Sequence, residues 1–202
     1  RGESDAPPPR QPHAAKSTRQ PDSAPPADDE YRYADNGMLL TASSNLNESN
    51  GWKTGQAEIT NVRFLSDETG EPLGVLKGGE KVRLRIEGLI HERLERPLIG
   101  FYVRDRLGQN LFGENTLAFT KERLNPAEAN SRLRAEFSFV LPMLPNGNYS
   151  LVASLADGTQ IEHTQHHWLH DAVLMEVSSS AVRWGIVGIP FKDVSLTIES
   201  NT

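Results

Sequence analysis

Short stretches in which apolar and polar residues alternate make up most of the chain after about residue 50. In residues 132–141 (RLRAEFSFVL) every second residue is apolar, and most of the residues between are charged or polar. Alternation with a period of two is typical of a strand that buries one face. The same pattern predicts strands at residues 56–65, 81–90, 98–104, 110–113, 148–156, 170–178 and 191–200. In the last of these, Val194, Leu196 and Ile198 are the expected buried positions.

The spacing of these segments predicts an all-β fold. Turn-forming residues separate them at regular intervals, and helical periodicity is almost absent. Seven to nine short strands with regular turns are typical of an immunoglobulin-like antiparallel β-sandwich, which is the fold we expect. Tyr149 follows the turn Pro145-Asn146-Gly147 at the start of a strand, the position of a tyrosine corner. We therefore expect Tyr149 to support the fold rather than contact a ligand.

The first fifty residues have a different composition. Seven of the thirteen prolines lie between Pro7 and Pro26, among Gln, Ser, Ala, Asp and Arg. Such a segment buries too little apolar surface to offset its conformational entropy. We expect a flexible Pro-rich linker over residues 1–50 and a β-sandwich domain over residues 51–202. A chain that begins inside a linker is expected to be part of a longer protein.

Composition excludes several kinds of chemistry. The chain has no cysteine, so it has neither disulfides nor zinc–thiolate sites. The net charge of −6 is spread along the chain without a basic stripe, so nucleic acid is not an expected partner. Residues 74–81 (GVLKGGEK) lack the order of glycines and lysine in a phosphate-binding loop, so ATP hydrolysis is not expected of this chain.

Two groups of residues offer possible catalytic or metal chemistry. Asp105, Glu114 and Asp157 lie at predicted strand ends, where carboxylates usually stabilise turns; two of them converging as glycosidase catalysts is the less favoured interpretation. Four histidines lie within residues 163–170. On a helix they would share one face and could hold a metal, whereas on a strand His163 and His167 would face one side and His166 and His170 the other. The flanking turn and strand favour the extended arrangement, and we expect no metal and no cofactor.

The segment LIGFYVRDRLGQNLFGENT, residues 98–116, resembles the C-terminal domain of Wzt-type proteins. Those proteins are the ATP-binding subunits of ABC transporters that export O-antigen polysaccharide. Further segments similar to the family follow in the same order, at residues 55–62, 79–82, 144–155, 171–172 and 188–191. The resemblance covers the folded part of the chain and leaves out the linker.

The resemblance implies a non-catalytic β-sandwich with a polysaccharide-binding sheet. It also implies a homodimer, in some members formed by exchange of the last strand, here residues 191–200. The parent protein would carry a separate ATPase domain and contact the transmembrane subunit of the transporter. It would act in the cytoplasm, at the inner face of the inner membrane of a Gram-negative bacterium.

Sugar-binding sites combine aromatic rings, which pack against C–H faces, with polar side chains that bind hydroxyl groups. Tyr102 and Arg104 offer this combination on one face of a predicted strand. The candidate contacts are Tyr102, Arg104, Arg134, Ser154, Trp168 and His167. We expect the LFGENT segment, residues 111–116, to be structural.

These observations predict a module that recognises O-antigen polysaccharide, at its non-reducing end, for export. One alternative is a protein-interaction sandwich, in which another chain covers the face carrying Tyr102, Arg104, Arg134 and Ser154. Another is an accessory domain of a carbohydrate-active enzyme.

Overall fold

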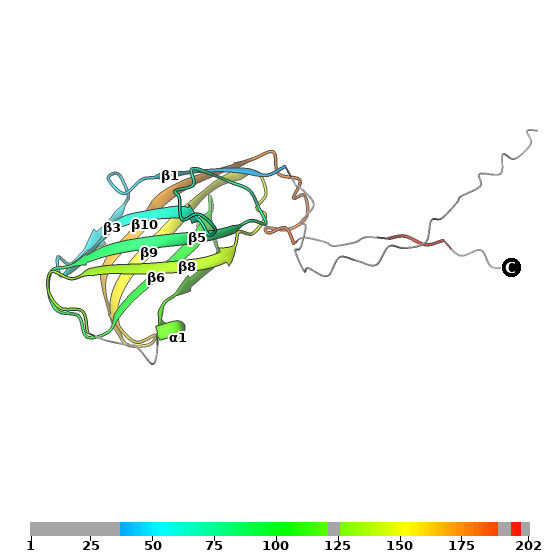
Figure 1. Ribbon diagram of the computed structural model, residues 1–202. Helices are drawn as coiled ribbons and strands as arrows, with labels where there is room; N and C mark the ends of the chain where they lie inside the picture. Colours follow the sequence, from blue (N-terminus) through cyan, green and yellow to red (C-terminus); the bar gives the residue numbers. More distant parts are fainter. Residues whose placement is uncertain (1–36, 121–125, 190–194, 199–202) are drawn as a thin grey trace, which may run out of the picture. The chain divides into compact units, whose positions relative to one another are not determined.

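The computed structural model describes residues 37–120, 126–189 and 195–198, in which the alternating segments form antiparallel strands (Figure 1). A single four-residue helix in this part, α1 (Leu117–Thr120), follows β7, and no helix in the described residues is long and apolar enough to cross a membrane. The strands are β1 (Leu39–Ser44), β2 (Gly51–Lys53), β3 (Ala57–Ser66), β4 (Val75–Leu76), β5 (Lys81–Ile90), β6 (Pro97–Asp105), β7 (Asn110–Asn115), β8 (Arg132–Val140), β9 (Gly147–Gly158) and β10 (His163–Ser178).

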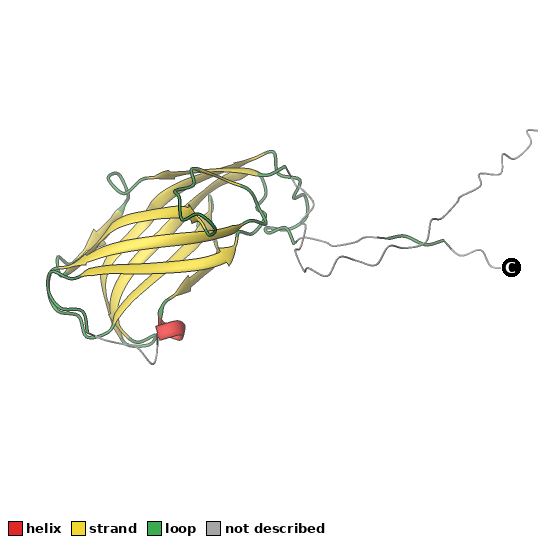
Figure 2. Cartoon of the chain, viewed as in Figure 1, coloured by secondary structure: helices red, strands yellow, loops and turns green. Residues whose placement is uncertain are grey.

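Two antiparallel sheets form the sandwich (Figure 2). The larger sheet has the strand order β4-β1-β10-β9-β6-β7, and β2 joins it by pairing with β10. The smaller sheet has the order β3-β5-β8. Apolar side chains from both sheets fill the space between them as one core. The expected all-β sandwich is confirmed.

Strand β5 illustrates how alternation produces the two faces. Val82, Leu84 and Ile86 are fully buried in the core. Between them, Arg83 and Arg85 point outward and form ion pairs with carboxylates of neighbouring strands and loops. Burial of one aliphatic side chain contributes about 1.5–3 kcal/mol, whereas an exposed ion pair contributes about 0–1 kcal/mol. The inward face therefore determines how the strand packs.

Tyr149 forms the expected tyrosine corner. Its hydroxyl donates a hydrogen bond to the Pro145 carbonyl oxygen at 2.8 Å, across the turn that precedes β9. Burial raises the pKa of the Tyr149 phenol, and the nearby Asp105 carboxylate raises it further. The residue supports the fold, as its position after the turn predicted.

The sandwich begins earlier in the chain than the sequence indicated. β1 pairs with β10 along all six of its residues, and Met38 and Leu40 are buried in the core. The prediction of a linker over residues 1–50 is therefore wrong for residues 37–50, while residues 1–36 lie outside the described part. β1 is short and Leu40 is its one fully buried residue, so its pattern does not stand out from the polar residues around it.

The predicted strand at residues 191–200 is not formed in the portion that the structure describes. Residues 195–198 belong to no strand, and the Leu196 and Ile198 side chains are 89% and 86% exposed, contrary to the expected burial. Residues 191–194 and 199–200 lie outside the described residues. The alternating pattern is present, but the described part of this chain supplies no surface that buries it.

Candidate functional site

The outward face of the larger sheet carries a pocket over three neighbouring strands. The register aligns Gly100 of β6, Ser154 of β9 and Trp168 of β10 in one row across the sheet. Gly100 has no side chain, and a β-carbon there would lie 3.2 Å from both Ser154 Oγ and Asn115 Cβ. The absence of a side chain at Gly100 therefore avoids crowding against Ser154 and Asn115 in this row.

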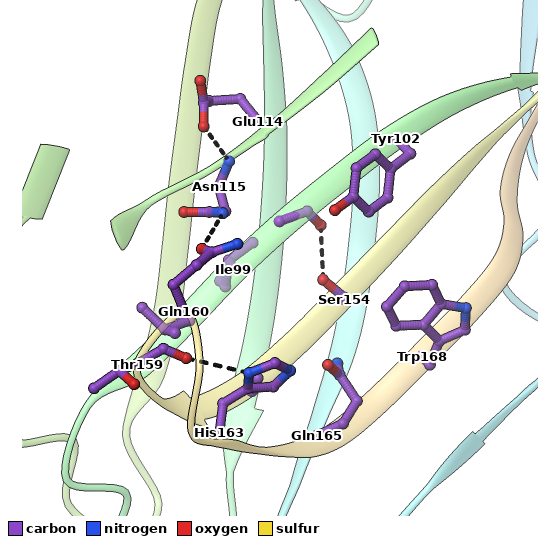
Figure 3. A pocket seen from close by; sticks show the side chains of 13 residues that line it. Ile99, Tyr102, Glu114, Asn115, Ser154, Thr159, Gln160, His163, Gln165 and Trp168 are labelled. Atoms are coloured by element: carbon purple, nitrogen blue, oxygen red, sulfur yellow. Dashed lines mark hydrogen bonds between the residues drawn. The ribbon is translucent and has the colours of Figure 1, made fainter. Parts of the chain in front are cut away.

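This pocket has a volume of about 100 Å³ (Figure 3). Aliphatic residues and Gly100 contribute an apolar surface, and polar and aromatic side chains surround it. The lining residues are Leu98, Ile99, Gly100, Tyr102, Glu114, Asn115, Ser154, Ala156, Thr159, Gln160, His163, Gln165 and Trp168.

The loop between β9 and β10 forms one wall of the pocket. Its ends are closed by a hydrogen bond from Thr159 N–H to the Glu162 carbonyl oxygen at 2.7 Å, and Gly158 ahead of it has a φ of 130°. Across the pocket, Asn115 Nδ2 of β7 donates to Gln160 Oε1 at 3.3 Å. The loop is therefore held at its base by the hairpin and at its side by β7.

Polar side chains on β10 are held in fixed orientations. The Gln165 amide nitrogen donates to two backbone carbonyl oxygens, those of Leu155 at 2.9 Å and His167 at 2.8 Å. The His163 ring nitrogen Nδ1 lies 3.1 Å from the Thr159 carbonyl oxygen. These contacts orient both side chains before any ligand binds, which reduces the entropy lost on binding.

Two aromatic side chains offer flat apolar surfaces at this site. Tyr102 is 37% exposed, and Trp168 is partly exposed. The Trp168 indole N–H is already used, since it donates to His170 Nδ1 at 3.3 Å, and the two rings meet edge to face. Trp168 therefore presents its ring face to a ligand rather than its N–H.

The structure brings together three of the six residues predicted as sugar contacts: Tyr102, Ser154 and Trp168 all line the pocket. Arg104 lies further along β6, and its Nε donates to Asn110 Oδ1 at 2.7 Å. It belongs to the same strand as Tyr102 but does not line the pocket.

The other two predicted contacts lie elsewhere. Arg134 is on β8 of the smaller sheet, where it pairs with Glu87 at 3.4 Å. The expectation that Arg134 shares a face with Tyr102 and Ser154 is therefore wrong. His167 is 8% exposed, and its Nδ1 accepts a hydrogen bond from the Ile59 backbone N–H of β3 at 2.8 Å, so it lies between the sheets.

A β-bulge explains the misplaced histidine. Gln165 pairs with Ala156 and His167 with the adjacent Leu155, so His166 is an extra residue in β10. Simple alternation puts Gln165 and His167 on one face, but the bulge turns Gln165 outward and His167 inward. The predicted grouping of His163 with His167 is wrong for this reason.

The four clustered histidines have separate partners. His166 is buried, with Nδ1 3.1 Å from Thr54 Oγ1, and burial lowers its pKa despite the opposing Asp157 and Glu92 carboxylates. Burial and, to a smaller extent, Lys53 lower the pKa of His167. Within the described residues, no three His, Cys, Asp or Glu side chains are grouped so that they could hold a metal ion.

The strand-end carboxylates bind backbone amides. Asp105 Oδ1 accepts from the N–H groups of Leu107 at 2.8 Å and Gln109 at 2.9 Å, and the Asp157 carboxylate accepts from two consecutive amides before β6. Glu114 accepts from the Asn115 N–H at 2.9 Å and is also a lining residue of the pocket. The favoured interpretation, that carboxylates at strand ends support turns, holds for Asp105 and Asp157.

Sequence reasoning missed the amide side chains of the pocket. Asn115 belongs to the LFGENT segment, which was expected to be structural, and Gln160 lies in the β9–β10 loop. Gln165 lies two residues before the buried His167, and without the bulge its direction cannot be deduced.

The comparisons with known proteins agree with this architecture. The fold is similar to the crystal structure of the C-terminal domain of wzt, with a TM-score of 0.63 and 20% sequence identity, covering 74% of this chain and 89% of that one. The crystal structure of chicken MD-1 complexed with lipid IVa gives a TM-score of 0.33 at 11% identity, over 70% of this chain and 89% of that one, which is too low to support an argument. A search of curated proteins found no match.

Sequence comparison assigns the family. The sequence model of the family described as "Wzt C-terminal domain" matches residues 48–189, which is well over half of the chain. That domain is a non-catalytic part of the ATP-binding subunit in O-antigen ABC transporters. With the matching fold and the matching sequence, the chain belongs to the Wzt C-terminal domain family.

Proposed function

We propose that this domain binds O-antigen polysaccharide, at its non-reducing end, through the pocket on the larger sheet. The observation that carries the proposal is the placement of two aromatic rings, Tyr102 and Trp168, beside the oriented polar groups of Ser154 and Gln165. A sugar ring has apolar C–H faces and hydroxyl groups at its edge, and it needs both kinds of surface.

The family places the domain in a transporter. The ATPase would be a separate domain of the parent protein, beside the transmembrane subunit at the cytoplasmic face of a Gram-negative inner membrane. Occupancy of the pocket by the end of a finished polymer would link completion of the chain to its export. The domain itself performs no reaction in this scheme.

Binding is expected to be weak. The pocket is small and open, and each hydrogen bond to a sugar replaces one that the sugar and the protein made to water. Several weak sites on a long polymer or on two subunits would compensate through effective concentration.

The test is binding of the full chain to delipidated O-chains from the source strain and from an unrelated strain. Trp168→Ala is expected to weaken binding of the cognate chain about tenfold or more, because it removes the larger aromatic face. Leu174→Ala is the matched control, since Leu174 lies on the same strand, is also exposed, and is outside the pocket.

The predicted arginines form a second matched pair. Arg104→Ala tests whether the polymer extends from the pocket along β6, and Arg134→Ala on the other sheet is expected to have no effect. Failure of the folded chain to bind either O-chain would contradict the proposed function. Binding that survives Trp168→Ala would retain the function and move the site.

We also propose that the domain forms a homodimer by exchange of residues 191–200. The support is a set of large apolar side chains after β10 that are exposed in the described part of the chain. These residues are Trp184, Ile186, Ile189, Leu196 and Ile198. A partner subunit would supply the apolar surface that the alternating pattern of this segment requires.

A further inference from the structure

We propose that the pocket selects an uncharged sugar that presents hydroxyl donors, and rejects a terminal residue carrying phosphate or carboxylate. The inference rests on the proposed function and specifies its ligand class. It comes from the directions of the hydrogen bonds already made by the polar lining residues, which leave mainly acceptor atoms free.

Gln165 supplies the first free acceptor. Carbonyl oxygens can only accept hydrogen bonds, so the group 2.9 Å from the Leu155 oxygen and 2.8 Å from the His167 oxygen must be the amide nitrogen. Both N–H bonds of Gln165 are therefore used by the backbone. Its oxygen has no hydrogen-bond donor among the described residues and remains available to a hydroxyl group of a ligand.

His163 and Ser154 also donate their hydrogens to backbone carbonyl oxygens and keep an acceptor atom free. The partner of His163 Nδ1 is the Thr159 carbonyl oxygen at 3.1 Å, so Nδ1 carries the hydrogen and, in the neutral ring, Nε2 accepts. Ser154 directs its hydroxyl hydrogen to the Gly100 carbonyl oxygen at 3.4 Å, which leaves lone pairs on its oxygen. Figure 3 shows His163, Ser154 and Gln165 on neighbouring parts of the pocket wall.

The charges of the lining residues also disfavour an anionic ligand. Glu114 contributes a carboxylate, and none of the described lining residues is a lysine or an arginine. Arg104, the cation on β6 nearest to Tyr102 in sequence, directs its Nε to Asn110 instead. The remaining donors, such as the Tyr102 hydroxyl and the Gln160 amide, are neutral.

An anionic sugar is a poor match for these groups. Phosphate and carboxylate oxygens are acceptors, so they would face the free acceptors of Gln165, Ser154 and Glu114 without gaining hydrogen bonds. They would also lose hydration and be repelled by the Glu114 charge. A hydroxyl group of a neutral sugar can donate to each of the same atoms.

The experiment compares matched sugars on the full chain by NMR. The probes are methyl glycosides of glucose, galactose and mannose, each with its uronate and 6-phosphate counterpart. The signals of the Trp168 indole and the Gln165 side-chain amide report pocket binding. At least one neutral glycoside is expected to bind about tenfold or more tightly than its two anionic counterparts.

A pair of charge-reversal variants tests the cause. Glu114→Lys is expected to reduce the preference for the neutral sugar to about threefold or less. Glu176→Lys makes the same charge change at an exposed position of β10 outside the pocket, and it is expected to leave the preference unchanged. A preference that is equal in both variants would contradict the role of Glu114.

Two other outcomes overturn the inference. Anionic glycosides that shift the pocket signals as strongly as neutral ones would show that the pocket does not select against charge, while leaving polysaccharide binding intact. No shift of the pocket signals with any glycoside would also overturn it. The O-chain binding assay then decides separately whether the proposed function survives.

Discussion

Individual residues at the pocket act mainly through hydrogen bonds that are already made and through small side chains. Gln165 and His163 are oriented by backbone carbonyl oxygens, and Gly100 leaves room that any larger residue would fill. A ligand therefore meets groups whose direction is set by the sandwich. Substitutions that leave the fold intact but change these directions should alter selectivity more than affinity.

The tyrosine corner stabilises the fold through one side-chain hydrogen bond. Tyr149→Phe is expected to lower the free energy of unfolding by about 1 kcal/mol, because it removes the hydrogen bond to the Pro145 carbonyl oxygen. Urea denaturation monitored by fluorescence measures the change. Tyr102→Phe is the control and should leave stability within about 0.5 kcal/mol, since the Tyr102 hydroxyl has no hydrogen-bond partner among the described residues.

The two buried histidines predict a pH dependence of stability. Burial lowers the pKa of His166 and His167 below the ordinary value of 6.5, so below that pH the unfolded chain binds protons that the folded chain does not. Their contribution is therefore complete above about pH 6.5 and is lost as the pH falls. For His167, protonation of Nδ1 would also remove the acceptor for the Ile59 N–H.

Urea denaturation between about pH 8 and pH 5.5 measures this effect, which is expected to reach at most about 1.4 kcal/mol per histidine for each pH unit. His167→Asn keeps an acceptor near the Ile59 N–H but does not titrate, so it should flatten the profile. His170→Asn changes an exposed histidine on the same strand and should not. An identical slope in all three proteins would contradict the assignment.

At the scale of secondary structure, β10 connects most of the features described here. It pairs with β1, β2 and β9, contributes His163, Gln165 and Trp168 to the pocket, and buries His167 between the sheets. The bulge at His166 lets one strand both line the pocket and bury His167, because it reverses the faces of the residues that follow.

Much of the architecture, but less of the site, was predictable from the sequence. Alternation located strands such as β5 and β8 because each is long and buries one clear face. It did not locate β1, which has one fully buried residue, and it assigned His167 to the wrong face because a bulge leaves no signal in a single sequence. Arg134 looked equivalent to Arg104 because pattern alone does not say which sheet a strand joins.

Gly113 allows β7 to pair closely with β6, opposite Tyr102. A β-carbon on Gly113 would lie 2.2 Å from the Phe101 carbonyl oxygen and 2.7 Å from Tyr102 Cδ1. Gly113→Ala should therefore cost about 1–3 kcal/mol of stability and displace Asn115, which weakens O-chain binding. Gly74→Ala is the control, since its β-carbon would meet nothing within 4 Å, and near-equal stability of the two variants would contradict the prediction.

For the whole molecule, the proposed strand exchange predicts a dimer that depends on the end of the chain. The double variant Leu196→Asp and Ile198→Asp should shift the protein from dimer to monomer, because burial of two carboxylates in an apolar interface is unfavourable. Light scattering coupled to size-exclusion chromatography measures the mass. Leu107→Asp changes a similarly exposed leucine in the β6–β7 turn and should leave the dimer intact.

Two results of the mass measurement would contradict strand exchange as the basis of the dimer. If the unmodified chain is monomeric at the concentrations used for O-chain binding, exchange of residues 191–200 is contradicted. If both the double variant and Leu107→Asp remain dimeric, subunits associate through another surface.

The short loop between β9 and β10 has a consequence for how such domains can diversify. Its closing hydrogen bond and Gly158 complete the hairpin at the base, so residues can be added or removed beyond that point without changing the register of either strand. The same loop carries Gln160 to the edge of the pocket. Replacement of this loop could therefore change which ligand the pocket prefers, while the sandwich that carries the pocket is inherited unchanged.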